Sequence, residues 1–172
     1  MTSERVRMGL PLWLWWIFAV TVAFAFSLVA NGLVNWRFYG ALGFAAAGGV
    51  AGLIQWLALP DRFVKGSWWV WASILGWGLG FAALWYLFVG DYIPLLAGLA
   101  GGLIVGLVQW FEMRARVKNA TWWLLANLLG WALGFWIGEY LGSSIHAVVG
   151  FPVFGIIVGL VTGGTMVWLL KE

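Results

Sequence analysis

The sequence predicts an all-α integral membrane protein in which six transmembrane helices form three tandem helical hairpins. Two observations predict the class. Of the 172 residues, 64% are hydrophobic and 9% are charged, whereas a soluble domain is near half apolar and a quarter charged. The apolar residues also form six runs, each long enough to cross a hydrocarbon core, which takes about 20 helical residues. This composition excludes a soluble enzyme, a nucleic-acid-binding protein, a disordered tail and a disulfide scaffold.

The six runs are the expected spans of a single transmembrane domain over residues 1–172. They are too long and too uniformly apolar for the alternating strands of a β-barrel. We expect the first run to be a span, because it is too long for a cleavable signal peptide and lacks a small-x-small cleavage site. The expected spans are Leu10–Ala30, Gly40–Leu59, Trp68–Val89, Ile93–Phe111, Trp122–Gly138 and His146–Leu170.

The basic residues predict the orientation of these spans. When the loops are assigned to alternate sides, eight of the nine Lys and Arg residues fall on one side together with both termini, and Arg37 alone falls on the other. The positive-inside rule therefore predicts cytoplasmic termini.

Two stretches of the chain repeat at a fixed offset. Ser67–Phe81 reads SWWVWASILGWGLGF and Thr121–Phe135 reads TWWLLANLLGWALGF, so nine of these fifteen positions are identical. The next helix of each copy also corresponds, because GLIQW at Gly52–Trp56 matches GLVQW at Gly106–Trp110, and GLVTG at Gly159–Gly163 is a third copy. Ser67 and Thr121, just before the paired tryptophans, are expected to cap helix starts.

These matches predict three parallel hairpin repeats, near residues 1–60, 61–113 and 114–172. Each repeat holds one odd and one even helix, so all three have the same orientation about a pseudo-threefold axis along the membrane normal.

Small residues recur four apart in the helices of each repeat. This spacing places them on one helix face, where two backbones can approach closely. We expect glycine-mediated packing throughout, with the even helices lining the axis because they carry both repeated glycines and repeated glutamines. The glycines are Gly48, Gly52, Gly76, Gly80, Gly102, Gly106, Gly130, Gly134, Gly155 and Gly159.

Tryptophan is the compositional outlier, with 16 residues. One interpretation of those near the predicted cytoplasmic ends is an interfacial belt at the level of the lipid headgroups. The other is an aromatic surface that binds a lipid, a quinone, a carotenoid or other pigment, or a partner subunit. Trp77 and Trp131 lie deeper and are expected in the core. The eleven near the ends are Trp13, Trp15, Trp16, Trp56, Trp68, Trp69, Trp71, Trp110, Trp122, Trp123 and Trp168.

Gln55, Gln109 and Thr162 are the candidate polar interior residues. Each follows a repeated glycine by three positions and so lies on the helix-packing face. An amide at that depth has no partner in lipid, which predicts hydrogen bonds between helices. The alternative is that the three residues line a central site for the polar head of a ligand.

Glu139 and His146 form a second candidate cluster, on the predicted non-cytoplasmic side, at the same level as Asp91 and Tyr92. A carboxylate and an imidazole can relay protons, and the imidazole can ligate a metal or a pigment. A single His without a second nitrogen or sulfur ligand argues against a protein-only metal site. The simpler interpretation is a pair of solvated loop ends.

No catalytic motif is present in the sequence. It lacks a phosphate-binding glycine loop and an HExxH pair, and no span carries an ionisable residue near its middle, as pumps and secondary transporters usually do. We therefore expect a protein that is not an enzyme.

The repeated strings GLxQW and WWxxAxxLGWxLG resemble those of small, Trp-rich, multi-spanning membrane proteins of cyanobacteria and filamentous phototrophic bacteria. The resemblance covers about residues 40–135. It implies a bacterial inner membrane or a photosynthetic membrane, and it brings no catalytic residues. In size and span number the chain is also similar to the substrate-binding subunits of energy-coupling-factor vitamin transporters.

We expect an accessory or scaffold subunit that packs against membrane lipids, hydrophobic cofactors or partner membrane subunits. The alternative is a small-molecule binding or transport component with a site between the repeats.

Overall fold

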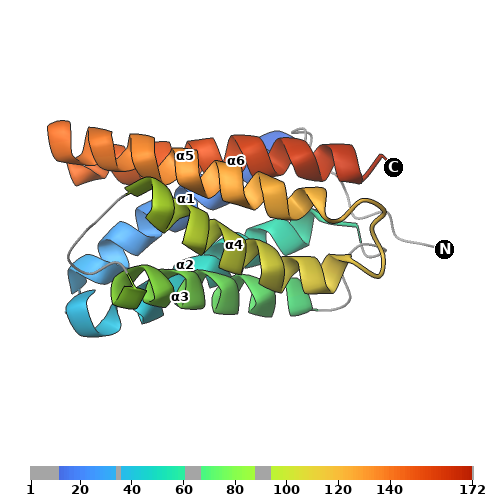
Figure 1. Ribbon diagram of the computed structural model, residues 1–172, viewed down its shortest axis with the longest axis horizontal. Coiled ribbons are helices and arrows are strands. Elements are labelled where there is room, and N and C mark those ends of the chain that lie inside the picture. The colour runs from blue at the N-terminus through green and yellow to red at the C-terminus, as the bar shows by residue number, and fades with distance from the viewer. Residues whose placement is uncertain (1–11, 34–35, 61–66, 88–93, 172) are drawn as a thin grey trace.

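The computed structural model describes residues 12–33, 36–60, 67–87 and 94–171. As predicted, this part of the chain is all-helical, and it forms six helices (Figure 1). They are α1 (Leu12–Leu33), α2 (Trp36–Ala58), α3 (Trp68–Leu87), α4 (Pro94–Met113), α5 (Trp122–Ser144) and α6 (Ala147–Leu169).

Helices α1, α2 and α5 extend beyond the expected spans at one end of the bundle. Helix α5 continues to Ser144, past the expected end at Gly138, and only two residues separate it from α6. Hydropathy marks the part of a helix that suits hydrocarbon, whereas the exposed polar residues Glu139 and Ser143 extend the same helix beyond that part.

Within the described residues, five of the six helices are long and apolar enough to cross a membrane. The five do not include α3, a helix of 20 residues whose side chains the structure describes over residues 68–83. Helix α3 is as long as α4 and packs between α2 and α4, so the count of six spans stays our prediction.

The six helices form a closed ring. The backbone of each helix lies against those of its neighbours in the chain, and α6 lies against α1; no other pair of helices in the described residues comes this close. The expectation that the even helices line the axis is therefore wrong, because even and odd helices alternate around one ring and neither set is innermost. A ring of six helices leaves a central space too wide for backbone contacts, so long side chains fill it instead.

The connection between α4 and α5 lies at the same end of the bundle as the C-terminal end of α6 (right in Figure 1), and the connection between α5 and α6 lies at the opposite end.

The repeated glycines face sideways, toward the adjacent helix of the ring. A Cβ atom at Gly102 of α4 would lie 2.5 Å from the carbonyl oxygen of Asn127 of α5. Gly155 and Gly159 of α6 face α1 in the same way, and Gly48 and Gly52 of α2 face α3. These distances are shorter than van der Waals contact, so the backbones are close only because glycine lacks a side chain.

The glycines of the odd helices face the other neighbour. Gly76 and Gly80 of α3 lie against α4, where a Cβ atom at Gly76 would be 3.1 Å from Val105 Cα. Gly134 of α5 lies against Phe154 of α6. At Gly130 the equivalent contact is 3.5 Å, which is ordinary van der Waals distance and leaves room for a methyl group. The repeated small residues therefore make contacts of unequal closeness.

Two glycines of α6 provide a matched test of the close approach between α6 and α1. Gly159→Ala places a methyl group 2.6 Å from Ile17 Cα, whereas Gly164→Ala meets nothing within 4 Å. We expect Gly159→Ala to lower the free energy of unfolding in detergent by about 1–3 kcal/mol relative to Gly164→Ala, the usual cost of overpacking. Equal unfolding transitions, followed by circular dichroism, would show that the contact does not require glycine.

Candidate functional site

Three tryptophans meet at the centre of the ring. Trp16 of α1, Trp69 of α3 and Trp123 of α5 are each at most 1% exposed. Their ring centroids are 5.8–5.9 Å apart in all three pairs. Aromatic pairs at this separation contribute about 0.5–1.5 kcal/mol beyond the area they bury. The three residues lie 53 and 54 positions apart in the chain, at equivalent places in the predicted repeats.

Each of these indoles donates its N–H to one candidate polar residue on the adjacent even helix. Trp69 Nε1 lies 3.0 Å from Gln55 Oε1, Trp123 Nε1 lies 3.1 Å from Gln109 Oε1, and Trp16 Nε1 lies 3.1 Å from Thr162 Oγ1. We call these three hydrogen bonds the indole clasps. They join α2 to α3, α4 to α5 and α6 to α1, so they bridge successive predicted hairpins and close the ring.

One clasp extends into a longer network. The Gln109 amide nitrogen donates to Ser73 Oγ at 3.0 Å, and the Ser73 hydroxyl donates to the Trp69 carbonyl at 2.9 Å. Gln109 therefore ties together α3, α4 and α5. The equivalent of Ser73 in α5 is Asn127, which donates to the Trp123 carbonyl at 3.0 Å, whereas α1 has the buried Val20.

The clasp between α6 and α1 uses a shorter side chain than the other two. Thr162 stands where the other repeats have glutamine, and the next residue, Gly163, stands where they have Trp56 and Trp110. A Cβ atom at Gly163 would lie 2.9 Å from Trp16 Cβ, so this glycine lets α6 approach α1 closely. The closer backbone brings the short threonine hydroxyl within reach of the Trp16 indole.

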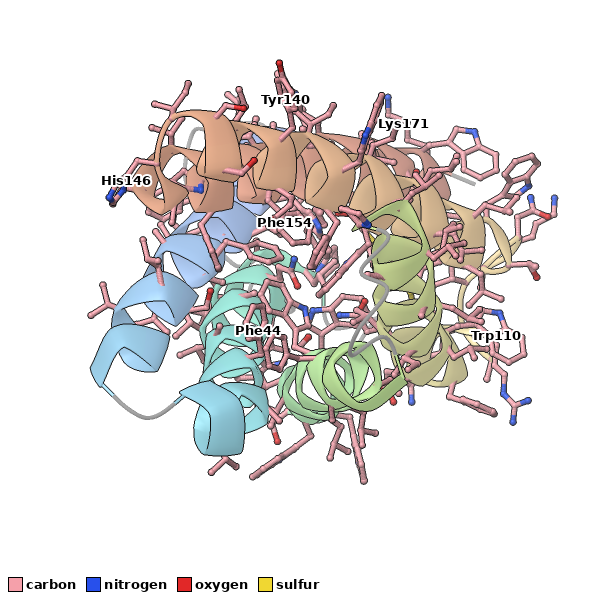
Figure 2. All side chains as sticks on the ribbon, turned by 60° about the vertical axis from the view of Figure 1, so that its left-hand side comes forward. Phe44, Trp110, Tyr140, His146, Phe154 and Lys171 are labelled. Carbon is pink, nitrogen blue, oxygen red and sulfur yellow. The ribbon has the colours of Figure 1, made fainter. Side chains whose placement is uncertain are left out.

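A second aromatic layer lies deeper in the bundle. Phe24, Trp77 and Trp131 have ring centroids 4.6–5.7 Å apart, and Phe154 lies 4.0 Å from Phe24. Figure 2 shows Phe44 and Phe154 pointing into the space between the helices. Trp77 and Trp131 are 3% and 1% exposed, so both lie in the core as expected.

The predicted tryptophan belt divides into two sets. The central tryptophans Trp16, Trp69 and Trp123 are buried and do not belong to it. In α3 and α5 their neighbours in the chain, Trp68 and Trp122, point outward and are 61% and 55% exposed. In the WW pairs of α3 and α5 one ring therefore enters the centre and the other faces the surroundings. In α1 the neighbour of Trp16 is the half-buried Trp15, whose indole N–H donates to the Ile54 carbonyl of α2 at 3.0 Å. In all three pairs the buried ring belongs to the second tryptophan, whose indole lies beside a residue at the matched polar position. The sequence predicts that polar position but not the helix rotation that brings the indole to it.

Glu139 and His146 are not joined. Both are exposed, and no ion pair or hydrogen bond links these two described side chains. His146 is instead the N-cap of α6, where its Nδ1 accepts from the Val148 N–H at 3.2 Å, and it lies at one end of the bundle (Figure 2). The described residues contain no group of three His, Asp or Glu side chains that could hold a metal ion. Asp91 and Tyr92 lie outside the described residues.

The predicted capping role of Thr121 is wrong, because its side chain makes no capping hydrogen bond. A turn at the start of α5 already supplies the acceptors. The N–H groups of Trp122 and Trp123 donate to the carbonyls of Asn119 and Ala120, both at 3.0 Å. Asn119 adopts a left-handed conformation, with φ of 59°, to form this turn. Ser67 starts α3 through its carbonyl, which accepts from Val70 and Trp71.

No family model, curated protein or solved structure matches the chain.

The indole clasps predict a specific energetic coupling. Trp123→Phe removes the donor of one clasp, and Gln109→Leu removes its acceptor. In a double-mutant cycle we expect a coupling of about 0.6–1.7 kcal/mol, from the average to the largest value measured for hydrogen bonds between transmembrane helices. Unfolding in mixed micelles, followed by circular dichroism, gives the free energies.

The control cycle pairs Trp123→Phe with Phe81→Leu. Phe81 stacks on Phe44 at a centroid distance of 4.2 Å, away from the clasp. Those two substitutions should add to within about 0.5 kcal/mol, as distant sites do. A coupling in the control as large as that in the clasp cycle would mean that the clasp has no specific role.

Proposed function

We propose that this protein is a non-catalytic membrane subunit that acts as a scaffold for lipids, hydrophobic cofactors or partner membrane proteins. The observation that carries the proposal is the occupied centre of the ring. Aromatic side chains fill the centre, and the buried Gln and Thr residues hydrogen-bond to them. The buried polar side chains therefore serve to hold the six helices together.

The candidate polar residues support this role over a central ligand site. A ligand that bound the amide oxygen of Gln55 or Gln109 would displace the indole N–H that donates to it. The displaced N–H would then be buried without an acceptor, because no water is present in the core of a bilayer. Opening a clasp would also separate the two helices that it joins. The binding or transport alternative requires such an opening, whereas the scaffold role does not.

The outer surface of the ring is the part free to bind. Large apolar side chains face outward from every helix, and they include Phe18, Leu42, Leu75, Leu103, Trp136 and Leu160. In a membrane this surface meets lipid tails, and a carotenoid, a quinone, another pigment or a partner helix would pack on it by shape.

The repeat arrangement is part of the proposal. The three clasps connect residues at matched positions, which supports three parallel hairpins about a pseudo-threefold axis. Thr162 and Phe24 differ from the residues at the matched positions of the other two predicted repeats, and the residues beside them differ in size so as to compensate.

Purification from the native membrane in a mild detergent tests the function directly. We expect stoichiometric partner subunits, identified by mass spectrometry, with Gln109→Leu as a variant that loosens the ring and releases them. A protein recovered alone with one tightly bound metabolite would overturn the scaffold proposal in favour of a binding or transport component.

The proposed topology places the termini and the loop between α4 and α5 in the cytoplasm of a bacterial inner or photosynthetic membrane. The chain contains no cysteine, so single cysteines give a clean signal. Ala115 and Ser143 are exposed residues near opposite ends of the bundle. We expect a membrane-impermeant maleimide to label Ser143→Cys in intact cells and Ala115→Cys only after permeabilisation. The reverse pattern would invert the topology.

A further inference from the structure

We infer that the turn after α4 binds the phosphate of an anionic phospholipid, through Arg114 and with help from Lys118. The inference rests on the membrane location in the proposed function but adds a specific lipid partner to it. It arises from an ordered basic turn beside exposed aromatic rings.

The turn that follows α4 is anchored to the end of the bundle. Met113, Val117 and Ala120 are at most 5% exposed, and the N–H groups of Arg116 and Val117 both donate to the Met113 carbonyl, at 2.8 and 2.9 Å. The residues between these anchors, which include Arg114 and Lys118, are exposed. Buried apolar residues therefore hold the basic side chains outward at a fixed place.

The Arg114 side chain rests on two aromatic rings. Its guanidinium carbon lies 5.3 Å from the Trp110 ring centroid and 4.7 Å from the Phe111 centroid. Both distances are within the range of a cation–π interaction. A guanidinium held in this way keeps N–H groups free to bind a phosphate by two hydrogen bonds.

The three basic residues of the turn differ in their available charge. Arg116 pairs with Glu112, one helical turn away, so its charge is partly neutralised. Among the described residues no carboxylate pairs with Arg114 or Lys118. These two cations remain to attract an anion.

The two rings under the guanidinium point to a lipid as the source of the phosphate. Phe111 is 59% exposed and Trp110 is half-buried. Indoles near the end of a transmembrane helix sit at the headgroup level of a bilayer. A phospholipid anchored there would present its phosphate to Arg114 and its acyl chains to the apolar flank of the helices. Free inorganic phosphate would gain nothing from these rings.

Native mass spectrometry of the full chain in detergent, titrated with phosphatidylglycerol or with phosphatidylcholine of the same acyl chains, tests the inference. We expect tighter binding of phosphatidylglycerol. Arg114→Gln should weaken that binding about fivefold, in keeping with the loss of one base near an anionic headgroup. Arg114→Lys keeps the charge but loses the planar fork, so its affinity should fall between the two.

Lys171→Gln is the matched control. It removes the same unit of charge, and Figure 2 shows Lys171 and Trp110 on different edges of the bundle. We expect it to leave phosphatidylglycerol binding unchanged. Equal weakening by Arg114→Gln and Lys171→Gln, or no preference for phosphatidylglycerol, would overturn the site. So would displacement of phosphatidylglycerol by inorganic phosphate at equal concentration, which would indicate a simple anion site.

Circular dichroism of each variant confirms folding, and Lys118→Gln provides a second variant on the same turn if Arg114→Gln does not fold. The result is separable from the scaffold proposal. Loss of lipid preference with partner subunits still co-purifying would refute the headgroup site alone.

Discussion

The buried indole N–H groups impose the central constraint on this fold. An indole in the middle of a helical bundle has one donor and no water to receive it, so an acceptor must come from a neighbouring helix. Trp16, Trp69 and Trp123 find those acceptors on α6, α2 and α4. Each bond determines which helix lies beside which, and the three together require that the last helix returns to the first.

Close backbone contact makes the clasps possible. Glycines of the even helices allow the approach of the following odd helix, and the indole then reaches across a short gap to Gln or Thr. Lipid tails are as apolar as leucine, so such an interface depends on shape and on hydrogen bonds instead of on exclusion of water. The same reasoning explains why the large apolar side chains on the outer face need no protein partner in a membrane.

The departures from the predicted threefold repeat occur in compensating sets. Phe24 replaces a tryptophan of the deeper layer, and Phe154 lies against it at the position where the other repeats have Ala47 and Gly101. In the same way, Thr162 and Gly163 replace a Gln-Trp pair at the junction of α6 and α1. A smaller side chain at one place is matched by a larger ring or a closer backbone at another, which keeps the centre filled.

Composition and spacing were sufficient to predict an all-helical membrane protein, its six helices, and the polar residues at matched positions, because these depend on local apolar runs and helical periodicity. The sequence could not show that the glycines face sideways, that one tryptophan of each WW pair turns inward, or that His146 caps α6 instead of pairing with Glu139. Those outcomes depend on the rotation of each helix about its axis. That rotation is set jointly by all six helices when the ring closes, so it cannot be predicted from the sequence of any one helix.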